Sequence, residues 1–433
     1  MMICKECNKI CNAKRFQQNF KNWTSGNNFI DKFIQNTQLK THEYTYEALE
    51  WVPYDRFYDI KYIAKGGFGK VYKANWIDGP IIEWDDQVEN WKRHGQNKLV
   101  ALKSLNTKNV SLEFMNEITS HQTLNFDLPI GAVIKFYGMT QDPLTENYMM
   151  ILDYAEDGSL RNYLNASYNK LSWYDKISYL NKIAFGLENI HNNEIIHRDL
   201  HVGNILINRG SSLITDMGLC KPADYNTSEN TKNEIYGVLP YIAPEILRGQ
   251  NYTKASDIYS FGIIMYEVIS GLPPYHDVSH DKYLAIRICQ GLRPRFHIKV
   301  PQLIVHLIKR CLDANPLDRP KVNEIEKILD QWKHQLQESR ELDQTELKIQ
   351  IKEADEINSK LSINNFPLTN LALSYETHSE AIYTSRLLNF NNLPKPRNSN
   401  DYYNDCDNTI TAEYSESLQI DISQLNINKD DQK

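Results

Sequence analysis

The stretch Ile196-His197-Arg198-Asp199-Leu200-His201-Val202-Gly203-Asn204-Ile205-Leu206 carries the most chemical information in this sequence. It follows a long segment with helical apolar spacing and ends in a short apolar run, which predicts a loop between two ordered elements. The carboxylate of Asp199 can accept a hydroxyl proton, and the amide oxygen of Asn204 can bind a hard cation such as Mg²⁺. Twelve residues beyond Asn204, Asp216 offers a second oxygen ligand. We expect Asn204 and Asp216 to hold a metal ion against a polyphosphate.

Two segments on the N-terminal side of this loop fit a phosphate site. Residues 64–71, AKGGFGKV, are rich in glycine, so backbone amides can approach phosphate oxygens without a Cβ in the way, although a tight turn without a ligand would look the same. Lys103 lies in an otherwise apolar strand, where an ammonium group is costly unless it is paired. The following helix offers Glu113 and Glu117, and Glu117 is the better partner because it shares a face with apolar residues.

Together these motifs resemble those of the eukaryotic protein kinases, most of all the tyrosine-kinase-like group, and the flanking segments are similar to those of a large fungal set of such kinases. The resemblance runs from about Phe57 to about Trp332. It implies a bilobal α+β fold with a small antiparallel-sheet lobe and a larger helical lobe, which agrees with strand patterns that come before helix patterns. It also implies phosphoryl transfer from ATP to a protein hydroxyl group, with Mg²⁺ as the metal.

The resemblance implies a role for each residue that matches a kinase motif. Asp199 would be the catalytic base, Lys103 would contact the α- and β-phosphates, and Glu117 would be its ion-pair partner. Asn204, which also counts among the catalytic residues, and Asp216 would be the magnesium ligands. The ATP-binding residues would be Ile63, Ala64, Lys65, Gly66, Gly67, Phe68, Gly69, Val71, Ala101, Lys103, Asp153, Ala155 and Leu206.

The resemblance also implies contacts that support the site. Glu245 would pair with Arg319, and Asp257 would anchor the catalytic loop from a buried helix. Residues 153–157 would form the hinge that binds adenine, preceded by Leu152 at the gatekeeper position.

Five positions depart from the family pattern. Ala64 stands in place of the first loop glycine, and Met217 in place of the usual phenylalanine. His201 replaces the lysine typical of serine/threonine kinases, Gly203 replaces the arginine typical of tyrosine kinases, and Val238 replaces a common threonine. The last three leave the class of hydroxyl substrate open, and we favour serine and threonine because the tyrosine-kinase arginine is missing. A pseudokinase or ATP-binding scaffold is the alternative, although the lysine and both aspartates that such proteins usually lose are present.

Composition limits the remaining classes of function. Hydrophobic residues make up 41% of the 433-residue chain, which is enough for a sizeable core. The 48 basic and 55 acidic residues give a net charge of −7, which argues against a nucleic-acid footprint across the domain. No apolar stretch approaches the roughly 18 residues that cross a bilayer. We expect a cytoplasmic enzyme that acts on protein and ATP and binds neither nucleic acid nor membrane.

Three cysteines near the N-terminus have part of a zinc-site spacing. Cys4, Cys7 and Cys11 supply three soft ligands, but tetrahedral zinc needs a fourth, and the next histidine or cysteine is His42, far along the chain. A zinc site would thus need an unusual fourth ligand or a partner chain. We interpret the three residues as exposed or degenerate thiols.

The chain divides into four regions by composition: an N-terminal extension with a cysteine-rich start at 1–56, the kinase-like domain at 57–334, a charged helical extension at 335–362, and a tail at 363–433. We expect a solvated helix in the third region. We expect most of the tail to be disordered, although residues 381–390 could dock. Predicted ordered elements are helices near 31–39, 113–124, 177–190 and 257–270, and strands within 57–74, 99–105 and 149–154.

Overall fold

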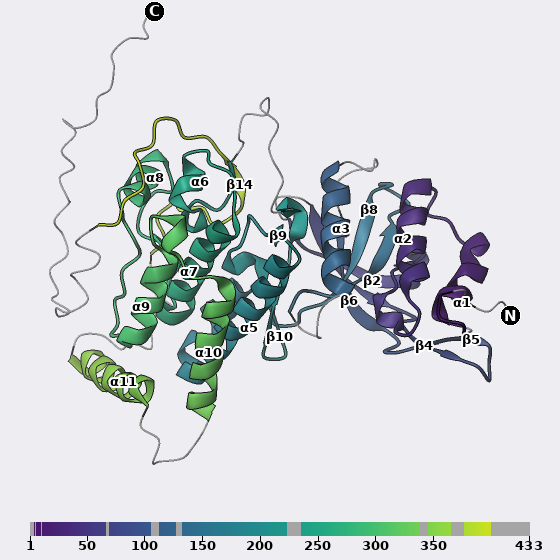
Figure 1. Cartoon of the computed structure of the whole chain (residues 1–433), viewed down its shortest axis with the longest axis horizontal. Coiled ribbons are helices and arrows are strands. Elements are labelled where there is room, and N and C mark those ends of the chain that lie inside the picture. Colours follow the sequence, from purple (N-terminus) through teal and green to yellow (C-terminus); the bar gives the residue numbers. More distant parts are fainter. Residues whose placement is uncertain are drawn as a thin grey trace, which may run out of the picture.

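The structure, a computed structural model, describes residues 4, 6–9, 11–65, 69–104, 112–126, 132–222, 235–337, 345–364 and 376–399. Figure 1 shows two lobes along the long axis, one built on a sheet and a larger one built of helices. This bilobal α+β arrangement confirms the predicted fold class.

The first lobe contains a six-stranded sheet in the order β1-β7-β8-β6-β3-β2. Neighbouring strands are antiparallel, as predicted for this lobe, except that the short strand β1 from the N-terminal extension adds to β7 in parallel. The predicted strands within 57–74 and 149–154 are confirmed, and the strand predicted at 99–105 is confirmed as far as residue 104, because residue 105 lies outside the described residues. The sheet strands are β1 (Glu50–Trp51), β2 (Phe57–Lys65), β3 (Lys70–Trp76), β6 (Lys98–Ser104), β7 (Phe136–Gln141) and β8 (Tyr148–Asp153).

The N-terminal extension packs on this lobe through helix α2 (Asn28–Lys40). Ile30 and Ile34 of α2 are fully buried in a cluster that also holds Phe114 and Ile118 of helix α3 (Leu112–Phe126). The N-terminal extension therefore shares a core with the helix that carries Glu117.

An inserted hairpin connects the extension to the sheet lobe on a second side. Strands β4 (Ile81–Asp85) and β5 (Asn90–Arg93) form this antiparallel hairpin. Helix α1 (Asn12–Asn19) contacts it, because the rings of Phe16 and Trp91 stack with centroids 4.2 Å apart and Arg15 pairs with Asp86 at 2.6 Å. Helix α1 thus lies at the outer end of the sheet lobe (Figure 1).

The helical lobe is organised around two long buried helices. Helix α5 (Trp173–Asn192) buries the predicted apolar face, and helix α7 (Lys254–Ser270) is buried on almost every side, as expected of a helix in a core. A capping box formed by Ser172 and Asp175 defines where α5 begins. The other helices are α4 (Leu160–Ser167), α6 (Pro244–Leu247), α8 (Lys282–Cys289), α9 (Gln302–Cys311) and α10 (Val322–Gln337).

Two short pairs of antiparallel strands flank the loop at 197–204 and the residues that follow β11 (Ser211–Ile214). Strand β9 (Ile195–Ile196) pairs with β12 (Lys221–Pro222), and β10 (Ile205–Asn208) pairs with β11. Both pairs are antiparallel, and they place the loop at 197–204 beside the residues that follow β11.

The region expected to be a solvated helix instead contacts the helical lobe. Helix α11 (Glu346–Asn364) buries Leu347 and Ala354, and Asp355 accepts a hydrogen bond of 2.9 Å from the ring nitrogen of Trp173. Farther on, residues 376–399 run over the helical lobe beside α6 and α8, shown in yellow in Figure 1. In this segment β14 (Arg386–Leu388) pairs antiparallel with β13 (Ile235–Gly237).

Among the described residues, none of the helices combines the length and the apolar character needed to cross a membrane.

Candidate active site

The sheet lobe delivers a lysine to the place where the two lobes meet. Lys103 lies in the central strand β6, opposite Val71 of β3 and Met150 of β8. Its Nζ donates to Glu117 Oε1 of α3 at 2.5 Å and to Asp216 Oδ1 at 2.8 Å. The predicted pairing of Lys103 with Glu117 is therefore present, and Asp216 joins it from the other lobe.

The charges in this cluster support one another. Burial opposes the charge on Lys103, but the nearby carboxylates of Asp216 and Glu117 outweigh it and raise the pKa of the lysine above its ordinary value. Burial also opposes ionisation of Asp216, but the ammonium of Lys103 holds the pKa of that carboxyl below its usual value. The lysine is thus charged at neutral pH, as neutralisation of phosphate oxygens requires.

The loop at 197–204 brings Asp199 and Asn204 together. Asn204 Nδ2 donates to the Asp199 carbonyl at 2.9 Å and lies 3.4 Å from Asp199 Oδ2. The Asn204 carbonyl in turn accepts the backbone N–H of Thr215 at 2.9 Å, next to Asp216. This chain of contacts holds the two predicted metal ligands on adjoining loops.

Asp257 of α7 anchors this loop, as predicted. Its carboxylate accepts the backbone N–H groups of His197 and Arg198 at 2.8 and 3.0 Å and contacts His191 Nε2 at 2.9 Å. Burial works against its charge, but these hydrogen bonds, that from His191 first among them, lower the pKa of Asp257. A buried acid with three partners can fix a loop without itself titrating near neutral pH.

His197 adds a second constraint from inside the loop. Burial lowers the pKa of this histidine, so its ring is neutral at pH 7. Its Nδ1 accepts the backbone N–H of Asp199 at 3.3 Å, and its Nε2 lies 3.2 Å from the Thr215 carbonyl, to which it donates. The neutral ring thus connects the loop of Asp199 with the loop of Asp216.

Two residues of the site adopt left-handed backbone conformations. Arg198 has φ 71° and Asp216 has φ 64°. Such values are uncommon for residues with a Cβ and collect at functional sites where surrounding contacts determine the backbone. They fit a site whose side-chain directions are set by the fold.

The predicted nucleotide-binding residues lie on neighbouring strands of the sheet and on β10. Of these, residues 66–68 are outside the described part of the chain. Met217, which replaces the usual phenylalanine, is fully buried. The others are Ile63, Ala64 and Lys65 at the end of β2, Gly69 directly before β3, Val71 in β3, Ala101 and Lys103 in β6, Asp153 at the end of β8, Ala155 two residues after it, and Leu206 in β10.

Asp153, the first residue of the predicted hinge, has a side chain that makes contacts within the sheet lobe. Asp153 accepts from Lys98 Nζ at 2.9 Å and from the Tyr137 hydroxyl at 3.3 Å, and its N–H donates to the Lys135 carbonyl at 2.9 Å. The Asp153 carboxylate is therefore occupied by contacts within the sheet lobe. Adenine would have to bind at this residue through its backbone groups.

Sequence motifs did not reveal every group at the site. The hydroxyl of Ser385 donates to Asp199 Oδ2 at 2.6 Å, across a separation of 186 residues. A second cluster is formed by Arg161, Tyr241 and Glu267. Arg161 and the Tyr241 hydroxyl both donate to the Glu267 carboxylate, and Arg161 also donates to the Tyr241 hydroxyl. Neither contact has a sequence signal, because each depends on how distant elements pack.

Comparison with known proteins agrees with this geometry. The model of the family described as protein tyrosine and serine/threonine kinase matches residues 59–329. A probable serine/threonine-protein kinase of Dictyostelium discoideum is 28% identical over 291 residues, which are 64% of this chain and 15% of that protein. The serine/threonine-protein kinase polo of Drosophila melanogaster is 28% identical, over 61% of this chain and 42% of its own length. Human mitogen-activated protein kinase kinase kinase 7 is 27% identical, over 62% of this chain and 40% of its own length. This chain thus spans less than half of each of these relatives.

Proposed function

The chain belongs to the family of protein tyrosine and serine/threonine kinases, and we propose that it transfers the γ-phosphoryl group of ATP to hydroxyl groups of protein substrates. The observation that carries this proposal is the single contact network of Lys103, Glu117 and Asp216, with Asn204 tied to both adjoining loops. The match of the family model confirms the resemblance inferred from the motifs. The likeness of the flanking segments to fungal kinases stays a prediction.

Phosphoryl transfer asks a protein mainly for positioning and for charge neutralisation. Lys103, kept charged by its carboxylates, would bind the phosphate oxygens. Asn204 and Asp216 carry the oxygen donors that suit Mg²⁺, which when bound with ATP would neutralise further phosphate charge. Asp199 would orient the attacking hydroxyl group and accept its proton, since its loop is fixed by Asp257 and His197.

We expect serine and threonine to be the acceptors in preference to tyrosine. Two of the relatives named above are serine/threonine-protein kinases by name. At Gly203, where tyrosine kinases typically carry arginine, an added Cβ would lie 2.7 Å from the ring of His201. An arginine at that position would therefore displace His201, so the local packing fits a site without it.

Transfer assays with substituted proteins test the proposal. The full chain is incubated with labelled ATP, Mg²⁺ and a degenerate peptide library, and the modified side chains are identified by mass spectrometry. Wild type should label serine and threonine, whereas Lys103→Met and Asp199→Asn should each lose at least about a thousandfold in rate. Thermal unfolding serves as the folding control. Wild-type protein that binds ATP but labels nothing would support the scaffold alternative, and labelling retained in either variant would contradict the assigned roles.

We extend the proposal to location. A cytoplasmic site of action agrees with the absence, among the described helices, of one suited to crossing a membrane, and the net charge of −7 fits protein rather than nucleic-acid substrates.

A further inference from the structure

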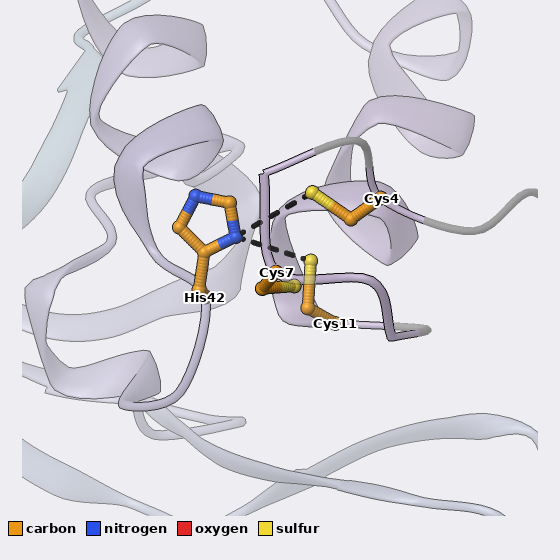
Figure 2. A group of neighbouring side chains, drawn as sticks. All are labelled: Cys4, Cys7, Cys11 and His42. Atoms are coloured by element: carbon orange, nitrogen blue, oxygen red, sulfur yellow. Dashed lines mark hydrogen bonds between the residues drawn. The ribbon is translucent and has the colours of Figure 1, made fainter.

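The N-terminal cysteines form a cluster with a distant histidine. The sulfur atoms of Cys4, Cys7 and Cys11 and a ring nitrogen of His42 all lie within 4.8 Å of one another. His42 Nδ1 is 3.7 Å from Cys4 Sγ and 3.3 Å from Cys11 Sγ, and Figure 2 shows the ring turned toward the sulfurs. All three cysteines are free thiols. The interpretation of these residues as exposed thiols was wrong for Cys4 and Cys11, which are only 5% and 6% exposed, and the fold places His42 where a fourth ligand could stand.

These distances suit a tetrahedral ion. Zinc bonds of about 2.3 Å to sulfur and about 2.0 Å to nitrogen place tetrahedral ligands roughly 3.5–4 Å apart. The separations of 3.3 and 3.7 Å from His42 Nδ1 to two of the sulfurs fall close to that range, and all four ligand atoms lie within 4.8 Å of one another. Three thiolates and one imidazole favour zinc over harder cations such as Mg²⁺. Four protein ligands leave no open position, which is the arrangement of a structural site.

The surrounding backbone holds the ligands in place. The N–H of Cys4 donates to the Lys9 carbonyl at 2.9 Å, and the Cys4 carbonyl accepts the N–H of Asn8 at 3.0 Å, so two hydrogen bonds hold Cys4 beside Asn8 and Lys9. From the other side, Asn12 donates its backbone N–H to the His42 carbonyl at 3.3 Å. Residues 42 and 11 are thus brought together by the start of α1.

A carboxylate completes the pattern of a metal-binding histidine. His42 Nε2 lies 2.9 Å from Glu6 Oε2. Histidine ligands commonly donate their second ring N–H to such a carboxylate, which fixes the tautomer and directs the other nitrogen at the metal. Here the other nitrogen is Nδ1, the atom that faces the sulfurs.

We propose that Cys4, Cys7, Cys11 and His42 bind one structural Zn²⁺ ion. The ion would fasten the N-terminal turn to the end of α2, whose Ile30 and Ile34 are buried with residues of α3. Its binding energy would therefore help to hold the extension against the sheet lobe.

Metal analysis of the full chain tests this site. Protein purified without chelator should contain about one zinc per chain, and replacement by Co²⁺ should give the absorption of a tetrahedral thiolate complex. Cys7→Ser and His42→Ala should lose bound zinc, whereas His94→Ala, at an exposed histidine of the inserted hairpin, should keep it. Glu6→Gln, a change at an exposed side chain that leaves all four ligands intact, should weaken zinc binding by about 10- to 100-fold. Wild type without zinc, or equal zinc in all variants, would overturn the proposal.

A second and independent observation concerns the C-terminal segment. The hydroxyl of Ser385 donates to Asp199 Oδ2 at 2.6 Å and lies 3.2 Å from His201 Nε2. Asp199 is the residue assigned above to accept the proton of a substrate hydroxyl. Ser385 therefore occupies the position of an acceptor serine.

Strand pairing presents this serine to the site. In the pairing of β14 with β13, Arg386 lies opposite Gly237, and Leu388 lies opposite Ile235. Strand β13 lies in the part of the chain between Asp216 and Glu245. Leu388 is only 6% exposed and packs in the core of the helical lobe, whereas its neighbour Leu387 is 55% exposed.

Side chains on both sides of Ser385 fix its neighbours. The Tyr383 hydroxyl donates to the Pro274 carbonyl at 2.9 Å, and the guanidinium of Arg161 lies 4.8 Å from the Tyr383 ring centre. Arg386 donates to the His280 carbonyl at 2.6 Å. Contacts on either side of one hydroxyl group indicate a specifically bound segment.

Resting on the proposed function, we infer that Ser385 is phosphorylated within its own chain. Its Oγ would bond to the γ-phosphorus while the bond from that phosphorus to the β,γ-bridging oxygen breaks. The bond electrons would leave with ADP, and the hydroxyl proton would pass to Asp199. The added charge of about −1.5 to −2 beside Asp199 would repel the segment, so phosphorylation would release it and open the site to other substrates.

Phosphosite analysis of the full chain tests the transfer. With ATP and Mg²⁺, phosphate should appear on Ser385 at a rate constant that does not change with protein concentration, as a reaction within one chain requires. Ser385→Ala should remove that site, and Ser379→Ala, at an exposed serine of the same segment, should leave it. Peptides labelled without Ser385 would overturn this inference alone, whereas no labelling of either would count against the proposed function itself.

Hydrogen exchange without nucleotide tests the docking separately. Leu388→Asp should release the segment and speed amide exchange in both 381–390 and 235–237, because it places a charge in the core. Leu387→Asp, at the exposed neighbour, should leave exchange unchanged. Equal exchange in wild type and both variants would show that the segment is not docked and would overturn the inference.

Discussion

Two buried ion pairs lie in different parts of the molecule, Lys103 with Glu117 where the lobes meet, and Arg319 with Glu245 inside the helical lobe. Lys103 receives partners from two lobes, since Asp216 also contacts it at 2.8 Å. Arg319 binds Glu245 through two contacts of 2.7 Å and donates further to the carbonyls of Ala255 and Asp313, each at 2.9 Å. Its side chain is 0% exposed.

This difference distinguishes an ion pair of the active site from an ion pair that only stabilises the fold. All contacts of Arg319 are made within one lobe, and its fork-shaped group is matched by a carboxylate and two carbonyls, so the pair can serve stability alone. Lys103 instead joins two lobes with a single ammonium held by two acids. Such an ammonium can exchange a carboxylate for a phosphate oxygen, which a fully enclosed guanidinium cannot do.

The largest expected effect on stability comes from breaking the enclosed pair. Glu245→Ala leaves a buried guanidinium without its carboxylate, and we expect the free energy of unfolding to fall by about 3–5 kcal/mol. Urea unfolding followed by fluorescence measures it. The double variant Glu245→Met with Arg319→Met should recover much of the loss, because apolar residues of similar volume can replace a buried ion pair. A loss below about 1 kcal/mol for Glu245→Ala would contradict a structural role for the pair.

Removal of the lysine should give a smaller loss that depends on pH. Burial raises the pKa of Glu117, so in Lys103→Met this acid can take up a proton and avoid an unpaired charge. A carboxyl whose pKa is raised in the folded state stabilises the fold below its unfolded pKa, and that contribution is lost as pH rises through the folded pKa. The loss of about 1–3 kcal/mol expected near pH 8 should therefore shrink toward pH 5.

Urea unfolding of Lys103→Met across that pH range provides the measurement. The matched control is Lys103→Met with Glu117→Gln, which has no acid at position 117 and should lose the part of the pH dependence that Glu117 causes. Any pH dependence that remains is expected from Asp216, which also loses its ammonium partner. If both variants respond to pH in the same way, Glu117 is not the group that takes up the proton.

The contrast between the two pairs also shows what sequence could predict. The predicted pairs Lys103 with Glu117 and Glu245 with Arg319, and the anchor Asp257, are all present as contacts. Each of these residues belongs to a kinase motif, and the kinase fold brings these motifs together in space. The resemblance therefore predicted which residues would be in contact. The bilobal fold was predictable for the same reason, whereas the main strands and helices were predictable from the periodicity of apolar residues.

Other contacts depended on packing that no local pattern encodes. His42 reaches Cys11 across 31 residues because α2 returns the chain to its start, and Ser385 reaches Asp199 across 186 residues through the pairing of β13 and β14. The parallel strand β1 lies before the part of the chain that resembles kinases. Helix α11 makes polar contacts with the helical lobe, such as the one between Trp173 and Asp355. Its charged composition could not predict them, because a helix exposed to water has the same composition.

The smallest expected effect comes from a third pair with the same two residue types as the enclosed one. Arg310 and Glu324 are 2.5 Å apart in the helical lobe, but their side chains are 36% and 46% exposed. Because water and salt screen such a pair, Glu324→Ala should change the free energy of unfolding by no more than about 1 kcal/mol, and less at high salt. Urea unfolding at low and high salt, beside Glu245→Ala, measures this. If Glu324→Ala were as damaging as Glu245→Ala, burial would not be what distinguishes the two pairs, and enclosure would no longer explain why Arg319 supports the fold.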